Sequence, residues 1–360
     1  MKKKIKSSQL IFNIIAIMIV SSLFIVGALS LKVVWKMTAK NFRSNTEQIA
    51  YSARTMIDNR MNLYKDKVQA FIDETNFTDL NDVHEKLVLL SKEDKTILNM
   101  YYVDNVTDGF SQVADEEVDT LAVKNRSWYK TTVNGKGEFV RIAPYTDMLA
   151  DKNVKTISKA IVKDGQVIGV VGLDIDLDEF SKEFVGLKAG EDGKVIVVDN
   201  ETGFVVSHTD LDKIGGAEPT EYEAWNDILS TDKGFNKFKY ENEKYQAFHD
   251  TSETYGWKII VKISEDELAG PLYNLGYLLL AILVVAIAIA LTVTYFILKK
   301  FNKVIDDVMD MMKRVSEGDF NFELALNTST LEAYKIKNEF DDMKESIKGL
   351  LSNVSEEAIG

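Results

Sequence analysis

The chain has 360 residues, a formal net charge of −13 and no cysteine. Without cysteine there are no disulfides, thiolate metal ligands or cysteine nucleophiles, so an exported domain must rest on its hydrophobic core. The acidic balance argues against a nucleic-acid-binding surface, because the phosphate backbone requires basic partners.

The three histidines, His84, His208 and His249, lie far apart in the sequence, and no pair has the spacing of metal ligands. The sequence also has no phosphate-binding loop of the Gly-Lys-Ser type. We therefore expect no metal, no cofactor and no hydrolase chemistry. The sequence also shows no kinase or cyclase domain, and we predict that the chain is not an enzyme. His208, at the end of a strand-like run, is interpreted as structural.

The first predicted elements along the chain are two long apolar stretches that contain no charged residue. Each is long enough to cross the roughly 30 Å hydrocarbon layer of a membrane as a helix. We predict transmembrane helices at residues 10–34 and 272–298. A cleaved signal peptide is the alternative for the first stretch, which has a weak cleavage pattern at residues 28–30 but a longer apolar run than such peptides.

Lysines flank both stretches, four before the first and three soon after the second. Basic residues mark the cytoplasmic side, so we predict residues 1–9 and 299–360 inside the cell and residues 35–271 outside. Residues 36–271 carry 43 acidic and 29 basic side chains, so the negative charge lies on the outer part. The prediction is a multi-pass protein of the inner or plasma membrane.

No Gly or Pro occurs from Leu31 to Asp108. Within this stretch, apolar residues recur at steps of three and four from Ile49 to Phe71, which is the period of one helix face. The pattern predicts one long helix that leaves the membrane and ends near Asp73.

After Leu90 the sequence changes to short β-type runs separated by turns, among them an Asp164-Gly165 hairpin signal. The simplest packing is two successive antiparallel sheets along the long helix, one in residues 85–182 and one in residues 190–264. The fold class is α+β. The predicted strands are residues 97–103, 138–142, 156–162 and 166–173 in the first set, and 194–198, 203–206, 235–240, 244–249 and 257–263 in the second.

Two short heptad segments follow the second apolar stretch. Such segments cannot bury their apolar seams alone. They predict either a pair of amphipathic helices or a parallel four-helix module built from two copies of the chain. Their apolar positions are Ile305, Val308, Met312 and Val315, then Ile336, Phe340, Met343, Ile347 and Leu350.

These features resemble bacterial transmembrane chemoreceptors with a double Cache sensor domain and a HAMP domain. The Cache likeness rests on residues 199–208, which read Asp-Asn-Glu-Thr-Gly-Phe-Val-Val-Ser-His, and on residues 255–261. The HAMP likeness rests on Gly318-Asp319, Glu332 and the second heptad. It departs where the usual proline is absent near Val304 and where residues 333–334 are Ala-Tyr instead of Ile-Gly.

The resemblance implies two PAS-like sheets outside, a HAMP domain at residues 299–351 and a homodimer. It also implies that residues 352–360 begin a signalling domain that this sequence lacks, through which such receptors reach a chemotaxis adaptor and kinase. The expected function is a chemoreceptor that senses a small ligand. The alternatives are the input half of a sensor histidine kinase or diguanylate cyclase, and a naturally short ligand-binding protein.

Within the first sheet region, six residues resemble the amino-acid-binding signature of double Cache domains. An α-amino acid presents a carboxylate and an ammonium at a fixed short separation, so a selective site needs a cation and an anion held apart. The resemblance implies that an arginine binds the carboxylate, that a Trp-Tyr pair forms a wall, and that carboxylates with a tyrosine hydroxyl take the ammonium. The residues are Arg126, Trp128, Tyr129, Tyr145, Asp147 and Asp174.

A structural interpretation of the same residues stays open, in which Trp128 and Tyr129 are core and Arg126 pairs with an acidic neighbour. Two positions depart from the signature. Leu121 stands where the signature has a tyrosine, and Thr132 stands where it has a smaller alanine. A small carboxylate or an amine therefore remains open as the ligand, and the second sheet region is interpreted as a spacer or coupling module.

Overall fold

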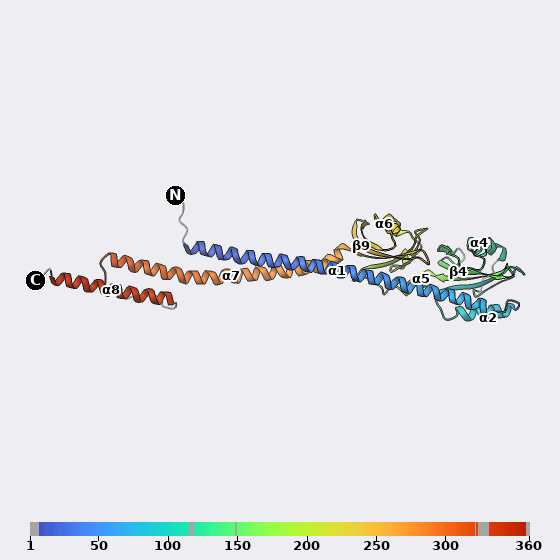
Figure 1. The fold of residues 1–360 in the computed structure, drawn as a ribbon, viewed down its shortest axis with the longest axis horizontal. Helices are drawn as coiled ribbons and strands as arrows, with labels where there is room; N and C mark the ends of the chain where they lie inside the picture. Colours follow the sequence, from blue (N-terminus) through green and yellow to red (C-terminus); the bar gives the residue numbers. More distant parts are fainter. Residues whose placement is uncertain (1–6, 115–118, 148–149, 321, 323–330, 358–360) are drawn as a thin grey trace. The chain divides into compact units, whose positions relative to one another are not determined.

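A computed structural model describes residues 7–114, 119–147, 150–320, 322 and 331–357 (Figure 1). By its internal contacts the chain divides into two units. Residues 34–272 form one of them, called the central unit below, and residues 1–33 and 273–360 form the other.

The predicted long helix is confirmed, because α1 runs without interruption over Ser7–Glu74. Neither Gly nor Pro occurs in its second half to break the backbone hydrogen bonds. In the central unit α1 buries one face, formed by residues three and four apart. These are Ala50, Ala53, Ile57, Met61, Tyr64, Val68 and Phe71.

The first sheet is antiparallel with the strand order β2-β1-β5-β4-β3. The β4–β5 hairpin closes at Asp164-Gly165, where both residues have positive φ, as this dipeptide predicts. Alternate residues of β1 face opposite sides: Met100 packs in the cluster that includes α1, whereas Tyr101 packs with α3 and α4. The strands are β1 (Ile97–Asp104), β2 (Phe110–Gln112), β3 (Tyr145–Asp147), β4 (Lys152–Lys163) and β5 (Gln166–Asp176).

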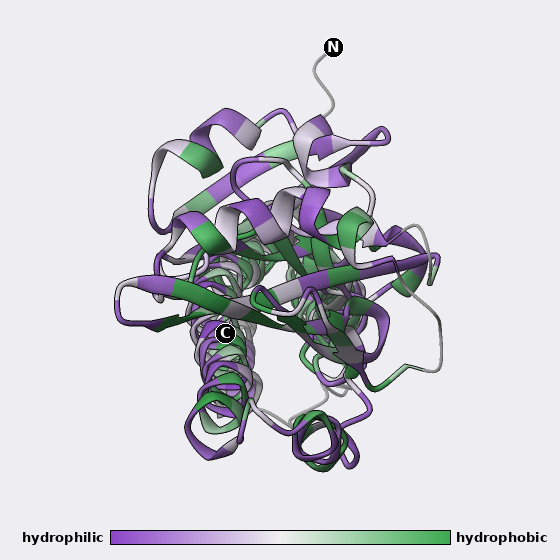
Figure 2. Cartoon of the chain, turned by 90° about the vertical axis from the view of Figure 1, so that its right-hand side faces the viewer, coloured by the Kyte–Doolittle hydropathy of each residue, from purple (hydrophilic) through white to green (hydrophobic). Residues whose placement is uncertain are grey.

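The second sheet repeats this arrangement with the order β7-β6-β10-β9-β8. Figure 2, seen from the end of the central unit that carries the first sheet, shows hydrophobic stretches on the strands and hydrophilic stretches along the surrounding loops. The strands are β6 (Lys194–Asp199), β7 (Val205–His208), β8 (Gly234–Tyr240), β9 (Glu243–Ser252) and β10 (Trp257–Ser264). The helices of the central unit besides α1 are α2 (Leu80–Ser91), α3 (Thr120–Asn125), α4 (Ser127–Asn134), α5 (Leu177–Lys182) and α6 (Trp225–Ser230), with short 3-10 turns at Leu211–Lys213 and Glu218–Glu221.

One predicted strand is wrong. Residues 138–142 form no strand, and β3 is the edge strand beside β4 instead. The backbone carbonyl of Ile142 accepts a hydrogen bond from the buried Lys155 Nζ. In a sheet this carbonyl would instead accept from a backbone amide of the neighbouring strand. The side chain of Arg141 reaches Asp199 at 3.2 Å. Side chains from distant residues therefore bind this segment.

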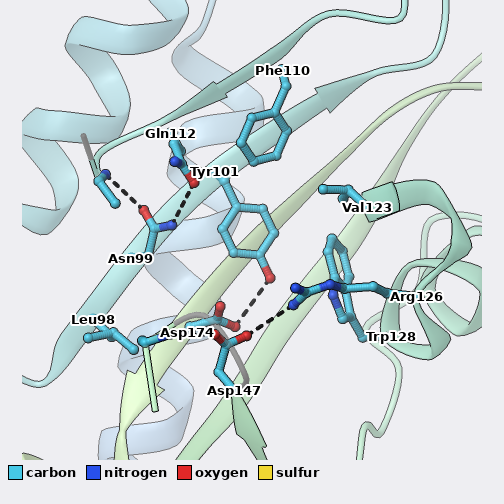
Figure 3. A pocket seen from close by; sticks show the side chains of 12 residues that line it. Leu98, Asn99, Tyr101, Phe110, Gln112, Val123, Arg126, Trp128, Asp147 and Asp174 are labelled. Carbon is cyan, nitrogen blue, oxygen red and sulfur yellow. Dashed lines mark hydrogen bonds and ion pairs between the residues drawn. The ribbon is translucent and has the colours of Figure 1, made fainter. Parts of the chain in front are cut away.

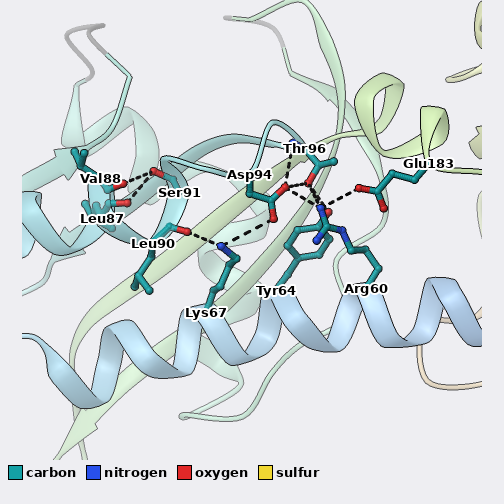
Figure 4. Close-up of polar contacts among 10 residues, drawn as sticks. All are labelled: Arg60, Tyr64, Lys67, Leu87, Val88, Leu90, Ser91, Asp94, Thr96 and Glu183. Atoms are coloured by element: carbon teal, nitrogen blue, oxygen red, sulfur yellow. Dashed lines mark hydrogen bonds and ion pairs between the residues drawn. The ribbon is translucent and has the colours of Figure 1, made fainter.

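Polar side chains of α1 attach the helix to the start of the first sheet (Figure 4). Arg60 Nη2 lies 2.8 Å from Asp94 Oδ1 and 2.9 Å from Glu183 Oε1. The Tyr64 hydroxyl lies 2.5 Å from the Thr96 hydroxyl in a buried contact. Thr96 precedes β1 directly, so this cluster fixes where the sheet begins along the helix.

The second unit contains the rest of α7 (Glu265–Ser316) and α8 (Leu331–Glu357). Both α1 and α7 contain a stretch long and apolar enough to cross a membrane, and neither stretch is buried in this structure. Met311 of α7 packs with Phe340 of α8, and further along both helices Arg314 and Lys344 lie against Phe322. The two helices therefore run in the same direction (Figure 1).

The heptad prediction needs one adjustment. Val308 and Val315 lie in the contact between α7 and α8, but Met311 takes the central place there. Met312 and Ile305 remain 61% and 40% exposed. The structure does not describe the side chains at some positions of the HAMP-like pattern, among them Glu332.

We expect Arg60→Ala to destabilise the central unit by about 2 kcal/mol, because the nearly buried Asp94 carboxylate loses a charged hydrogen-bond donor. Urea unfolding of residues 34–272 measures the change. Arg43→Ala is the control, since this exposed arginine of the same helix lies over the Phe235 ring and has no carboxylate partner among the contacts of the described residues. Equal effects of the two changes would contradict the assignment.

Candidate functional site

A pocket opens between the first sheet and the short helices α3 and α4 (Figure 3). The space between its lining residues, including the part open to solvent, is about 720 Å³. Of the predicted residues, Arg126, Trp128, Asp147 and Asp174 line it together. The predicted cation and anions therefore share one pocket, although they come from three separate segments.

Asp174 lies in the middle of the sheet floor. In the strand pairing it stands opposite Asn99 of β1 on one side and Thr156 of β4 on the other. Its Oδ1 accepts hydrogen bonds from the Thr156 hydroxyl at 2.6 Å and the Tyr101 hydroxyl at 3.2 Å. Burial raises the pKa of Asp174 to about 6, and these hydrogen bonds limit the rise.

The orientation of Tyr101 depends on Gly172, its partner in the neighbouring strand. A Cβ atom at position 172 would lie 2.3 Å from the Tyr101 ring. The tyrosine thus lies flat against the backbone of β5, and its hydroxyl reaches Asp174 two residue pairs further along the sheet. Only glycine allows this close approach.

Arg126 lies between α3 and α4. Its backbone is extended (φ −67°, ψ 147°), so α3 ends at this residue and α4 begins after it. Its Nη1 lies 3.0 Å from Asp147 Oδ2. The internal ion pair that the sequence left open is therefore present in the ligand-free chain. Both groups also line the pocket, so the pair does not remove them from the site.

The two aromatic residues of α4 have different surroundings. Trp128 lies in the pocket wall, with its ring 5.1 Å from that of Tyr101. The Tyr129 hydroxyl donates to Asn105 Oδ1, and Tyr129 is not among the described residues that line the pocket. Its contact attaches α4 to the turn after β1, so the predicted ligand contact of Tyr129 stays a prediction.

Tyr145 lies beside the pocket floor, where its hydroxyl is 3.0 Å from the Thr156 hydroxyl that also binds Asp174. Burial raises the pKa of Tyr145 above its usual range, so the phenol keeps its proton.

Of the two positions that depart from the signature, Leu121 is 66% exposed. The departure at Thr132 has a structural reason, because this buried hydroxyl contacts the Ser158 hydroxyl at 2.5 Å and holds α4 against β4.

Sequence reasoning missed several residues of the pocket. Asn99, Tyr101, Phe110 and Gln112 line it, and Thr156 lies under Asp174. Asn99 and Tyr101 are two apart in a predicted strand, so they share a face. This alternation could have placed the two residues on the same face of the sheet. It could not predict which of the two faces lies against α4.

The sequence pattern of the Cache domain matches residues 30–272. The chain belongs to the Cache domain family. It is similar to two methyl-accepting chemotaxis proteins of Bacillus subtilis (strain 168). TlpA is 26% identical over 305 residues, 81% of this chain and 44% of TlpA, and TlpB is 25% identical over 307 residues, 84% of this chain and 42% of TlpB. The chain thus spans less than half the length of these relatives.

Two solved sensor structures share the fold. The sensory domain of the Campylobacter jejuni chemoreceptor Tlp3 with isoleucine bound has a TM-score of 0.51 at 18% identity, over 65% of this chain and 97% of that one. An extracellular domain described as that of a histidine kinase, mmHK1S-Z3, has a TM-score of 0.51 at 15% identity, over 65% and 98% of the two chains. The likeness covers both curled antiparallel sheets.

The raised pKa of Asp174 gives a stability prediction. Its carboxyl group binds a proton more tightly in the folded chain, so its contribution to stability is lost as pH rises from about 4 to about 6. We expect Asp174→Asn to stabilise the ligand-free central unit at pH 8, by on the order of 2 kcal/mol, and to change little at pH 4. Urea unfolding at both pH values measures this.

The control is Asp164→Asn, in the exposed β4–β5 turn, where asparagine also accepts positive φ. An Asp174→Asn variant that is less stable than the original chain at pH 8 would mean that the fold stabilises the carboxylate, against the assignment.

Proposed function

We propose that the chain is the sensory and relay part of a chemoreceptor of the methyl-accepting type, and that its first-sheet pocket binds an L-amino acid. The single observation that carries the ligand proposal is that Arg126, Asp147 and Asp174 meet in one pocket beside an aromatic wall. The Cache family membership and the similarity to chemotaxis proteins support the receptor proposal.

The charges of the pocket favour a ligand that carries both signs. In the ligand-free chain Asp147 holds Arg126, and Asp174 is left with neutral hydroxyl donors. A ligand carboxylate alone would add negative charge beside two aspartates. An α-amino acid adds none, because its carboxylate binds Arg126 while its ammonium lies near Asp174 and the released Asp147.

An amine without a carboxylate is the second candidate, since it would bind Asp174 and leave the pair of Arg126 and Asp147 intact. Of the relatives in solved structures, Tlp3 was crystallised with isoleucine and with L-valine. These ligands were bound by Tlp3, and for this chain they support only the amino-acid class.

The relay proposal places residues 10–34 and 272–298 across the membrane, residues 35–271 outside and residues 299–351 in a HAMP domain. The apolar stretches of α1 and α7 and the lysines beside them support this topology. The parallel contact of α7 with α8 supports a HAMP-like pair, and the exposed Ile305 and Met312 would form the seam of a homodimer.

A sensor histidine kinase or diguanylate cyclase input is the alternative. The fold does not separate the two, because mmHK1S-Z3 shares it. The similarity to TlpA over 81% of the chain favours the chemoreceptor. The gene sequence that follows the codon of Gly360 tests this: long heptads without catalytic motifs support the receptor, and a kinase or cyclase motif overturns it.

We expect at least one L-amino acid to raise the thermal midpoint of residues 36–267, because a ligand that binds only the folded state stabilises it. Arg126→Ala and Asp174→Ala should each abolish the shift, since either change removes a charged partner at a cost of roughly 2–5 kcal/mol. Lys130→Ala, an exposed cation on α4, is the control.

No shift with any of the twenty amino acids would reject the ligand class, and shifts with amines or organic acids alone would replace it. An unfolded Arg126→Ala protein would mean that its pair with Asp147 serves stability.

The position of Leu121 gives a gain-of-function test. Its side chain is 66% exposed, so a tyrosine fits without overpacking. If the phenol that the signature places there contacts the ligand carboxylate, Leu121→Tyr adds a charged hydrogen bond and tightens binding about tenfold. Isothermal calorimetry with an amino acid that binds the original chain measures this. An unchanged affinity would show that position 121 faces away from the ligand.

The dimer is tested by single cysteines in a chain that has none. We expect Met312→Cys to crosslink between copies in membranes under mild oxidation, and Lys313→Cys to crosslink far less, because neighbouring helix positions point about 100° apart. Both side chains are exposed in the single chain, so only a partner helix distinguishes them. Equal crosslinking at both positions, or none, would reject the four-helix module.

A further inference from the structure

The pocket holds a pair of amide side chains that the charged groups of an amino acid would not use. Asn99 Nδ2 donates to Gln112 Oε1 at 3.0 Å, and Asn99 Oδ1 accepts from the backbone amide of Ala114 at 3.2 Å. Figure 3 shows this pair on one side of Tyr101, with Arg126 and Trp128 on the other side.

The amide pair is close to the place where the ligand ammonium would bind. Asn99 stands directly opposite Asp174 in the β1–β5 pairing, and such partners have their Cβ atoms about 5 Å apart. Gln112 follows on β2, opposite Tyr101. An amino acid whose ammonium lies over Asp174 can then direct a side chain of about two or three carbons toward the amide pair.

The chemistry of this end of the pocket is neutral and polar. Among the described lining residues, the charged ones are Arg126, Asp147 and Asp174, which would bind the α-carboxylate and the α-ammonium of the ligand. A charged ligand side chain would lose its water without gaining a partner of opposite charge. An apolar side chain would cover the amide groups without hydrogen-bonding them, whereas an amide offers both a donor and an acceptor.

We infer that Asn99 and Gln112 form the side-chain subsite of this pocket and select an L-amino acid with a neutral amide side chain, L-asparagine or L-glutamine. The inference rests on the proposed function, since it places the α-ammonium at Asp174 and the α-carboxylate at Arg126. A site built to hydrogen-bond a ligand group discriminates strongly against analogues that lack it.

The test is calorimetry of the full chain in detergent micelles with two sets of near-isosteric ligands. One set is L-asparagine, L-aspartate and L-leucine, and the other is L-glutamine, L-glutamate and L-methionine. We expect the amide member of at least one set to bind at least tenfold more tightly than its charged and apolar counterparts.

Gln112→Met should reduce that preference at least fivefold while binding of L-leucine or L-methionine is retained. This change keeps the shape of the side chain and leaves the bond from Ala114 to Asn99 in place, so β2 is expected to fold. Asn99→Leu is the second variant, and circular dichroism checks its fold. Gln246→Met is the matched control, since Gln246 lies on β9 of the second sheet and binds Glu265.

The outcomes separate the two proposals. If amino acids bind, but the amide members bind no better than their counterparts or keep their advantage in Gln112→Met, the subsite is rejected and the proposed function stands. If no amino acid binds at all, the proposed function fails and the subsite fails with it.

Discussion

The central unit depends on the unbroken face of α1. Both sheets belong to one hydrophobic cluster with that face, which extends from Phe42 to Phe71. A five-stranded sheet with one apolar face needs a cover, and the same helix supplies it to both. Polar contacts then set the register: Arg54, Asp58 and Asn62 bind the β9–β10 hairpin, and Arg60 and Tyr64 bind the start of β1.

The pocket shows how a binding site lowers the stability of its own fold. Asp174 is 8% exposed and has two hydroxyl donors but no cation within the contacts of the described residues, so its ionisation is unfavourable in the empty chain. Arg126 is already neutralised by Asp147. The empty site therefore holds one buried carboxylate without an ion-pair partner among the contacts of the described residues, and a ligand ammonium would supply one.

The sequence predicted those elements whose structure depends on residues close together in the chain. The helix period gave α1, and the Asp164-Gly165 turn gave the β4–β5 hairpin. The resemblance identified Arg126 and Asp174 as pocket residues. The residues that it missed depend on register, because Asn99, Tyr101 and Thr156 meet Asp174 only through cross-strand pairing, which no single segment encodes. The wrong strand at residues 138–142 has the same kind of cause, since Lys155 and Asp199 bind it from elsewhere.

The missed strand β3 also connects the pocket with the loop that follows β7 of the second sheet. Its Asp147 lines the pocket, while its Thr146 hydroxyl donates to Asn153 Oδ1 at 2.8 Å. Asn153 Nδ2 in turn donates to the carbonyl of Ile214, and the next residue, Gly215, approaches Asn153 so closely that a Cβ would lie 2.6 Å away. A ligand that replaces Asp147 on Arg126 acts directly on this strand. These contacts join the edge of the first sheet to the loop that bonds to β7, so a displacement of β3 has a route to the second sheet, within the limit of the ligand's differential affinity for the two arrangements.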